Sequence, residues 1–312
     1  MRIAILGGGA MGALFGGYLS RCNQVTIVDV NPALVERIRR CGVEIRERDG
    51  SVGIYRPQAV TSARGMAPVE LVVVFVKAMY SRAALEANRA LIGPDTYLMT
   101  LQNGAGHEEV LLEFAPRERV IIGTTQHNSS VIAPGVVSHG GGGPTWLGCL
   151  AGSPEEVEPI ARAFTDSGLE AGLSSQVQRL IWEKMFTNVS ASVLTGVLQC
   201  PLGAISANPD AWAACRALIR EAAAVAAGLG LEFDLEEKAA EVKAVCDNAP
   251  QGLTSIYADL RAGRPTEVDT ISGSVVRAGE RAGVPAPGHG LMVSLVHAME
   301  ALGTHRDHKE ES

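Results

Sequence analysis

The chain lacks several features that would place it in whole classes of protein. Its six cysteines form no CxxC pair and have no histidine at a metal-ligand spacing, which indicates buried thiols rather than a disulfide framework or a zinc site. No apolar stretch is long enough to span a bilayer, and the first residues do not have the form of a secretory signal. Scattered thiols of this kind are typical of a reducing compartment, so we expect a cytoplasmic protein without a membrane partner.

An excess of positive charge is also missing. The net charge at pH 7 is -7, and a nucleic-acid partner is not expected because phosphate contacts need a basic face. The seven histidines show no HxxxH or other ligand spacing, so no metal is expected. The sequence has no G-x-S-x-G turn, which removes support for a serine hydrolase. His127 follows a predicted strand and could line a cleft, although a histidine in a core or a turn is more common.

What the sequence does contain is a change of pattern near its middle. Its 312 residues fit two domains of roughly 100–200 residues each. The first part alternates helical patterns with short apolar runs, which predicts a doubly wound parallel sheet. These runs lie at residues 3–6, 25–28, 71–76, 97–101 and 120–123. Residues 124–148 are rich in Gly, Ser, Thr and Val and predict short, mostly antiparallel strands, and residues 154–167 predict a helix.

From about residue 176 the pattern is helical throughout. Candidate helices cover residues 177–198, 209–228, 235–248, 252–261, 267–282 and 289–302. We therefore expect an α/β protein with two domains, a dinucleotide-binding domain over residues 1–174 and an all-helical domain over residues 175–312. The helical domain is expected to bind substrate and to form a homodimer, because the apolar stretches 211–229 and 291–302 exceed what one small domain can cover.

A glycine-rich turn follows the first predicted strand and opens a helix. Residues 7–12 read Gly-Gly-Gly-Ala-Met-Gly, which fits the G-x-G-x-x-G fingerprint of a Rossmann-type domain. Gly7 permits the tight turn, Gly9 lets a pyrophosphate approach the backbone, and Gly12 lets the helix pack closely on the strand. Ala10 and Met11 lie at the helix N-terminus, whose N–H groups and positive potential suit phosphates.

Asp29 stands at the end of the second predicted strand. An acidic side chain there can accept both ribose hydroxyls of NAD and would repel the 2′-phosphate of NADP. It therefore favours NADH over NADPH as the cofactor. The alternative is that Asp29 caps the helix that starts near Pro32.

The stretch from Leu180 to Gln199 is a helical pattern with few charges and an unusual polar stripe. Lys184, Asn188 and Ser192 recur at every fourth position, so in a regular helix they share one face. From this spacing alone, Lys184 could equally extend from an exposed turn to solvent. Its chemistry suits reduction of a carbonyl group, because an ammonium can stabilise charge that develops on oxygen and donate the proton. Burial would lower its pKa and a neighbouring carboxylate would raise it.

Several motifs in the same order resemble the 2-dehydropantoate 2-reductase (ketopantoate reductase) family. They are WEKMFTNVSAS around Lys184, Val76-Lys77-Ala78, Leu101-Gln102-Asn103-Gly104, Thr254-Ser255-Ile256, the run from Arg264 to Asp269, and Ile271-Ser272-Gly273. The resemblance runs from the first residue to about residue 300. It implies reduction of 2-dehydropantoate to the D-2-hydroxy acid by hydride transfer from a nicotinamide cofactor.

The resemblance also implies a role for each matched residue. Lys184 is the general acid that protonates the C2 oxygen, and Glu267 holds this lysine and a substrate hydroxyl. The substrate-binding residues are Asn188, Ser192 and Ser255, of which Ser255 binds the carboxylate, while Asn103 lies by the nicotinamide ribose and Lys77 on the cofactor side. Each has a plainer alternative: Glu267 could favour a helix N-terminus after Pro265, Asn103-Gly104 could be a turn, and Lys77 a solvated strand end.

The sequence also departs from the family. Many members have Asn where this chain has Ser192 and Gly252, and many have a basic group where it has Asp29-Val30-Asn31. The chemistry is therefore better supported than the identity of the 2-keto acid. One alternative is an NAD-dependent D-2-hydroxyacid dehydrogenase of the same family that acts on another branched or aromatic 2-keto acid. An alternative of another class is a non-catalytic NAD(H)-sensing protein, which would need no Lys184 and Glu267 together.

Overall fold

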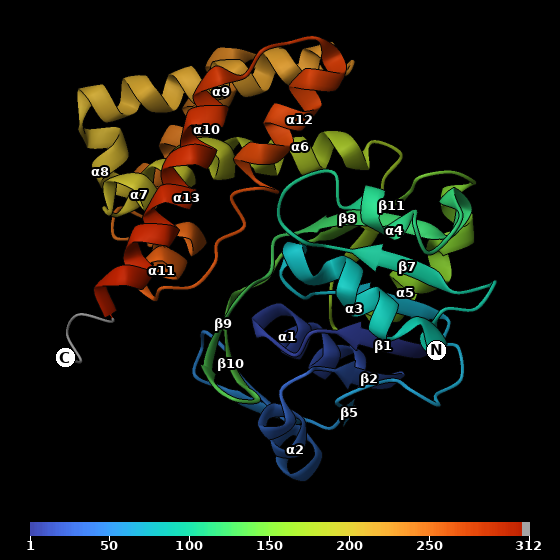
Figure 1. Ribbon diagram of the computed structural model, residues 1–312. Coiled ribbons are helices and arrows are strands. Elements are labelled where there is room, and N and C mark those ends of the chain that lie inside the picture. Colours follow the sequence, from blue (N-terminus) through green and yellow to red (C-terminus); the bar gives the residue numbers. More distant parts are fainter. Residues whose placement is uncertain (308–312) are drawn as a thin grey trace. The chain divides into compact units, whose positions relative to one another are not determined.

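The computed structural model describes residues 1–307 and contains two compact units, shown in Figure 1. Unit 1 comprises residues 1–102 and 107–180, and unit 2 comprises residues 103–106 together with the described residues from Ile181 on. Four residues in the middle of the first half therefore belong to the helical unit. The domain limits at residues 174 and 175 stay a prediction.

Unit 1 is built on an eight-stranded sheet with the order β12-β11-β8-β7-β6-β1-β2-β5. Its strands are β1 (Arg2–Leu6), β2 (Gln24–Val28), β5 (Gln58–Val60), β6 (Leu71–Val74), β7 (Tyr97–Thr100), β8 (Val120–Thr125), β11 (Thr145–Cys149) and β12 (Ala171–Leu173). The strands from β5 to β8 are parallel, and β11 is antiparallel to β8. This confirms the predicted parallel sheet and the antiparallel strands that follow it.

Both faces of this sheet are covered, as its alternating side chains require. Ile3 and Ile5 of β1 belong to a core shared with α1 (Ala10–Leu19), α2 (Pro32–Cys41) and α5 (Glu158–Asp166). Ala4 and Leu6 point the other way, into a core with α3 (Ser81–Ala87) and α4 (Glu108–Leu111). Each fully buried Ile or Leu contributes about 1.5–3 kcal/mol relative to exposure. The buried apolar residues of the central strands therefore fix the sheet and the position of its carboxyl edge.

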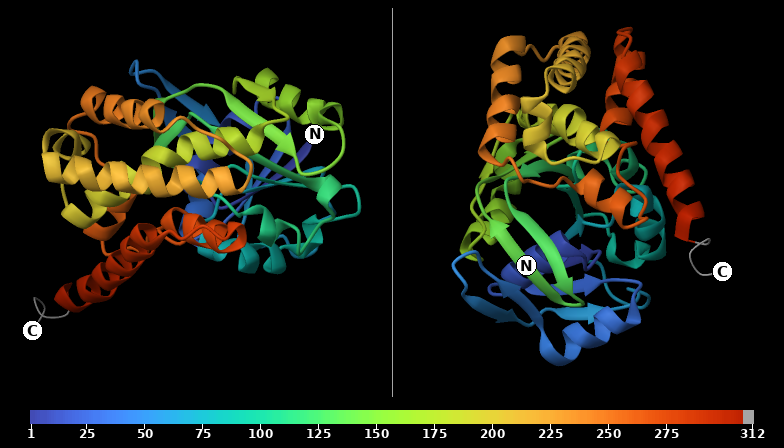
Figure 2. Two further views of the ribbon diagram at one scale, coloured as in Figure 1. Left: turned by 90° about the horizontal axis from the view of Figure 1, so that it is seen from above. Right: turned by 90° about the vertical axis from the view of Figure 1, so that its left-hand side faces the viewer.

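A second, four-stranded sheet packs beside α1 with the order β4-β3-β10-β9. Its strands are β3 (Val43–Arg46), β4 (Val52–Tyr55), β9 (Asn128–Ala133) and β10 (Val136–Gly141). The pair β9 and β10 is antiparallel, as predicted, and can be followed in Figures 1 and 2. The sequence did not predict β3, β4 or β5, because they are three or four residues long and mix charged or polar residues with apolar ones.

Unit 2 is helical, which confirms the predicted helical C-terminal region. Its elements are the end of α6 (Val177–Thr187), a π-helical turn (Asn188–Ser192), α7 (Val193–Leu198), α8 (Leu202–Ala207), α9 (Pro209–Gly228), α10 (Leu235–Asn248), α11 (Ser255–Arg261), α12 (Ser272–Ala282) and α13 (Pro287–Asp307). Figure 2 shows α13, in red, as one long helix. Within residues 1–307, no helix is both long enough and apolar enough to cross a membrane.

Two of the helix predictions were wrong in detail. The single helix predicted over residues 177–198 is interrupted by the π-helical turn. There the Ser190 hydroxyl donates to the carbonyl of Phe186, a local bond that competes with the regular helix ladder. The helix predicted over residues 267–282 begins only at Ser272. Before it, the carbonyl of Glu267 accepts the N–H groups of Thr270 and Ile271 and closes a tight turn.

Candidate functional site

Four parallel strands of unit 1 end at the same level. Leu6 of β1 is paired with Val28 of β2 and with Val74 of β6, and Val74 is paired with Thr100 of β7. The segments after these strands are the glycine turn, Asp29, the Phe75–Lys77 segment and the Leu101–Gln102 segment. The strand order reverses between β1 and β6, and in open α/β sheets ligands bind outside the carboxyl ends of strands at such a point.

The three glycines of the fingerprint have distinct steric environments. Gly7 has a φ of +100°, and a Cβ atom there would lie 2.8 Å from the backbone nitrogen of Val76. A Cβ atom on Gly12 would lie 1.8 Å from the carbonyl oxygen of Gly7. Gly9 precedes α1 and faces open space, because apart from its neighbours in the chain no described atom lies within 4 Å of its Cβ position. Gly9 with the first turn, Ala10 and Met11, can therefore receive a phosphate group.

Asp29 is held next to this turn rather than at a helix cap. Its two carboxylate oxygens accept the N–H groups of Gly8 (2.7 Å) and Asn31 (2.9 Å). The cap of α2 is Asn31, whose side chain accepts the N–H groups of Ala33 and Leu34. The alternative role of Asp29 as the helix cap is therefore wrong. Each of its oxygens keeps accepting capacity that suits a ribose hydroxyl.

Lys77 and Gln102 follow the ends of β6 and β7, and both are half-buried. The side-chain amide of Gln102 donates to the carbonyl of Val76 (2.5 Å) and to the hydroxyl of Ser81 (3.0 Å). Its own oxygen accepts the hydroxyl of Thr100 (2.8 Å). The sequence motif contains Gln102, but sequence reasoning assigned no role to it, because a side chain that bonds across strands leaves no periodic signal.

Asn103 begins the four-residue segment that belongs to unit 2. Gly104 has a φ of +105°, and a Cβ atom there would lie 2.0 Å from the carbonyl oxygen of Thr270. The same carbonyl accepts the N–H of Ala105 at 3.3 Å. Thr270 in turn donates its N–H and its hydroxyl to the carbonyl of Glu267. Unit 2 therefore places the backbones of the Asn103 and Glu267 segments next to each other.

Lys184 lies near the end of α6, in unit 2. The pKa of its ammonium group is lowered from 10.5 to about 8, because burial disfavours the charged form. As a whole residue Lys184 is nevertheless exposed to solvent. An ammonium with this pKa is mostly protonated at pH 7 and gives up its proton more readily than an ordinary lysine.

The predicted substrate-binding residues lie on the π-helical turn and on α11. Asn188 and Ser192 are the first and last residues of the turn, Ser192 is buried, and Ser255 is the exposed first residue of α11. The hydroxyl groups of Thr195 and Thr254 connect the two elements at 2.7 Å. Since Thr195 donates to the carbonyl of Ser192 and Thr254 accepts the N–H of Tyr257, a chain of bonds runs from α11 to the end of the turn.

Comparison with known proteins decides the family. Residues 3–152 match the family Ketopantoate reductase PanE/ApbA, and residues 176–300 match Ketopantoate reductase PanE/ApbA C terminal. The chain is 31% identical to a 2-dehydropantoate 2-reductase of Halobacterium salinarum, covering 97% of this chain and 100% of the relative. The chain belongs to the ketopantoate reductase family. The predicted resemblance is thereby confirmed, and this ketopantoate reductase family member is an oxidoreductase that acts on CH–OH groups with a nicotinamide cofactor.

Two further relatives illustrate the range of the ketopantoate reductase family. A 2-dehydropantoate 2-reductase of Lactococcus lactis is 29% identical, over 97% of this chain and 99% of its own length. The ternary structure of D-mandelate dehydrogenase with NADH and anilino(oxo)acetate is 29% identical, with a TM-score of 0.90 over 97% of this chain and 99% of that one. The latter protein binds NADH, which shows that the fold accommodates this cofactor.

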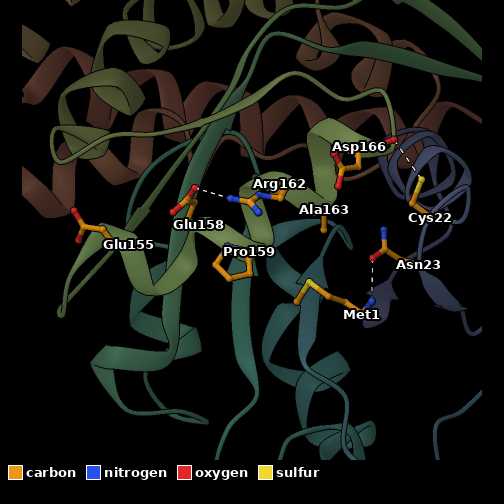
Figure 3. Close-up of a pocket in the computed structure, with 9 residues that line it drawn as sticks. All are labelled: Met1, Cys22, Asn23, Glu155, Glu158, Pro159, Arg162, Ala163 and Asp166. Atoms are coloured by element: carbon orange, nitrogen blue, oxygen red, sulfur yellow. Dashed lines mark hydrogen bonds and ion pairs between the residues drawn. The ribbon is translucent and has the colours of Figure 1, made fainter.

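A surface hollow of about 360 Å³ lies at the other edge of the sheet (Figure 3). Met1 and Asn23, which precede β1 and β2, line it together with Glu155, Glu158 and Asp166 from the α5 region. It lies at the amino ends of the strands, whereas ligands of open α/β sheets bind outside the carboxyl ends, so we do not assign the cofactor or the keto acid to it.

Unit 1 contains a hydrogen-bonded chain of side chains that the sequence did not predict. Tyr18 donates to Glu47 (2.6 Å), which accepts from Nδ1 of His139 (2.7 Å), and Nε2 of His139 lies 3.0 Å from Nδ1 of His127. His127 is thus part of a network, and burial lowers its pKa. Burial and the bond to Glu47 raise the pKa of Tyr18. Among residues 1–307, no group of three or more His, Cys, Asp or Glu side chains is placed to hold a metal ion.

Proposed function

We propose that this protein reduces a 2-keto acid, 2-dehydropantoate in the first place, to the D-2-hydroxy acid, with Lys184 as the general acid. A bound nicotinamide cofactor supplies the hydride to C2 of the keto acid. The ammonium of Lys184 stabilises the charge that develops on the C2 oxygen and donates the proton. The single observation that supports this role best is the position of Lys184 on α6, directly before the π-helical turn that carries Asn188 and Ser192 and within the segment that the family match covers.

The other residues of the site bind and orient the reactants. We propose that Glu267 holds Lys184 and a substrate hydroxyl, and that Ser255 binds the substrate carboxylate. Asn188 and Ser192 contact the rest of the keto acid from the π-helical turn. The glycine turn, Lys77 and Asn103 hold the cofactor. The environment of Asp29, where two backbone N–H groups fix the carboxylate, supports NADH over NADPH.

A second candidate function has support from two observations. It is the NADH-dependent reduction of another branched or aromatic 2-keto acid. The structure with a TM-score of 0.90 is that of a D-mandelate dehydrogenase. In this chain a Cβ atom on Gly252 would lie 2.9 Å from the carbonyl oxygen of Ala249, so this position does not accept a polar side chain without a shift of the backbone.

The loss of NADH or NADPH absorbance with purified protein tests both candidates. Ketopantoate and phenylglyoxylate are compared as substrates, and Lys184→Met is compared with Lys243→Met, an exposed lysine paired with Asp247 on α10. We expect turnover to fall by about 10²–10⁴-fold in Lys184→Met and to stay unchanged in Lys243→Met. Binding of cofactor without turnover of any 2-keto acid would contradict both candidates and support the NAD(H)-sensing alternative.

We also propose a homodimer through the helical unit. Leu291, Leu295 and Leu302 of α13 are 56%, 37% and 66% exposed, and their spacing puts them along one side of the helix. An exposed apolar stripe of this kind is typical of an interface. Light scattering should give twice the mass of one chain for the unsubstituted protein. The Leu295→Glu variant should give the mass of a single chain. A monomeric mass of the unsubstituted protein would contradict the proposal.

A further inference from the structure

We propose that Gln102 is a positioning residue, which holds the Val76–Lys77 segment in the geometry that receives the cofactor. The proposal rests on the cofactor site of the proposed function. It requires neither the identity of the keto acid nor the role of Lys184.

The first support is the set of contacts made by one side chain. Gln102 is the last residue of unit 1 before the chain enters unit 2. Both hydrogens of its amide group have acceptors in unit 1, the carbonyl of Val76 and the hydroxyl of Ser81, and its oxygen has a donor, Thr100. The side chain thus connects the end of β7, the loop after β6 and the first residue of α3. Its three bonds fix it in one orientation.

The second support is the position of the hydrogen bond between Gln102 and the carbonyl of Val76 in the loop after β6. The ladder of β6 ends at Val74, and the N–H of Phe75 still donates to Leu6 at 2.8 Å. Beyond that point the carbonyl of Val76 accepts from Gln102, and the carbonyl of Lys77 accepts the N–H of Tyr80 at 2.8 Å. The carbonyl groups of Val76 and Lys77 are therefore both held by hydrogen bonds. These bonds set the direction in which the side chain of Lys77 extends from the backbone.

The third support is the contact between Val76 and the glycine turn. The Cβ position of Gly7 lies 2.8 Å from the backbone nitrogen of Val76 and 3.0 Å from the carbonyl carbon of Phe75. Since glycine has no Cβ atom, the backbone of Val76 can approach the glycine turn this closely, and the two segments pack against each other. Loss of the Gln102 bond should therefore disturb both Lys77 and the backbone that faces the phosphates.

Gln102→Met tests the proposal, because methionine keeps the length of the side chain but cannot donate. We expect the dissociation constant for NADH, measured by its fluorescence at 25 °C, to rise about tenfold, since a lost hydrogen bond leaves the Val76 carbonyl unpaired. Ser81→Ala removes one acceptor of the same amide and should raise the constant less. Turnover at saturating NADH should change less than twofold. Gln178→Met, which removes an amide bonded to Glu108 in the same unit, is the matched control and should leave the constant unchanged.

Gln102→Glu adds a readout that a merely structural role would not give. The carboxylate cannot donate to Val76, but the protonated acid can, and the nearby carbonyl favours the protonated form. The affinity of this variant for NAD⁺, measured by calorimetry, should therefore recover as the pH falls from 8 to 5.5, relative to the unsubstituted protein. An unchanged affinity for NADH in Gln102→Met, or a lowered melting temperature without a change in affinity, would overturn the proposal. Failure of the unsubstituted protein to bind NADH or NADPH would instead overturn the cofactor site and the proposed function.

Discussion

At the scale of single residues, charge and local hydrogen bonding determine what Lys184 and Asp29 can do. Burial lowers the pKa of Lys184 to about 8 and so brings its proton transfer near neutral pH. The carboxylate of Asp29 has each oxygen fixed by one backbone N–H, so its position is set before a cofactor binds. The pKa of Lys184 and the position of Asp29 both depend on neighbouring groups that a periodic pattern in the sequence does not identify.

The lowered pKa predicts the pH dependence of reduction. A general acid acts in its protonated form, so kcat/KM for the keto acid should be flat below about pH 8 and fall about tenfold per pH unit above it. Steady-state rates with NADH between pH 6 and 10 check this. Lys184→Arg keeps the charge but does not titrate in this range, and the same decline in that variant would rule out Lys184 as its source.

Asp29→Asn should weaken the preference for NADH. One carboxylate oxygen becomes an amide NH₂ group that faces the N–H of Gly8 or Asn31, and the negative charge that repels a 2′-phosphate is lost. We expect the KM for NADH to rise about tenfold and the ratio of NADPH to NADH activity to increase. Asp49→Asn, an exposed aspartate that also accepts a backbone N–H, should change neither value. An unaltered cofactor ratio in Asp29→Asn would contradict the assigned role.

At the scale of secondary-structure elements, the π-helical turn and the start of α11 act together. Thr195 is fully buried and bonded both to Thr254, the cap of α11, and to the carbonyl of Ser192, the last residue of the turn. A Cβ atom on Gly196 would lie 2.4 Å from Cγ2 of Ile256, so α7 and α11 approach closely at this point. Two elements that carry proposed substrate residues are thereby fixed to each other.

Thr195→Val should therefore affect substrate binding more than catalysis. The substitution conserves shape but removes the hydroxyl that connects the two elements, so we expect the KM for the keto acid to rise by about three- to tenfold while NADH binding is retained. Thr195→Ser, which keeps a hydroxyl group, should have a KM for the keto acid close to that of the unsubstituted protein. Thr145→Val removes a hydroxyl from a similarly buried threonine pair in unit 1 and serves as the control for packing effects. Equal KM changes in Thr195→Val and Thr145→Val would argue against a specific connection.

At the scale of the whole molecule, we expect the buried His289 to make stability depend on pH. His289 is fully buried in unit 2, and its Nε2 lies 3.0 Å from the carbonyl oxygen of Leu218. Burial lowers its pKa below the ordinary value of 6.5. The unfolded chain therefore binds a proton at a higher pH than the folded one does. The contribution of the neutral form to stability is complete above about pH 6.5 and is lost as the pH falls below it, by up to about 1.4 kcal/mol per pH unit.

Thermal unfolding between pH 5 and 8 checks this contribution. The midpoint should fall as the pH is lowered below about 6.5, and the fall should be smaller in His289→Gln, which retains a donor for Leu218 but does not titrate. His297→Gln, at an exposed histidine on the same helix, provides the comparison. A pH dependence that His289→Gln leaves unchanged would assign the acid sensitivity to other groups.

The sequence by itself determined the features that depend on neighbours along the chain. The glycine turn, the apolar central strands and the helical second half were predicted because each produces a local pattern of size, hydrophobicity or backbone freedom. Only the tertiary structure decided the rest. The short strands β3, β4 and β5 gain their stability from pairing rather than from their own residues, and the π-helical turn replaces a regular helix that the spacing predicted. Folding also brings together the groups that form the hydrogen bonds of Gln102, lower the pKa of Lys184 and position Asp29. Contacts of this kind leave no periodic pattern in the sequence, so the sequence could not predict them.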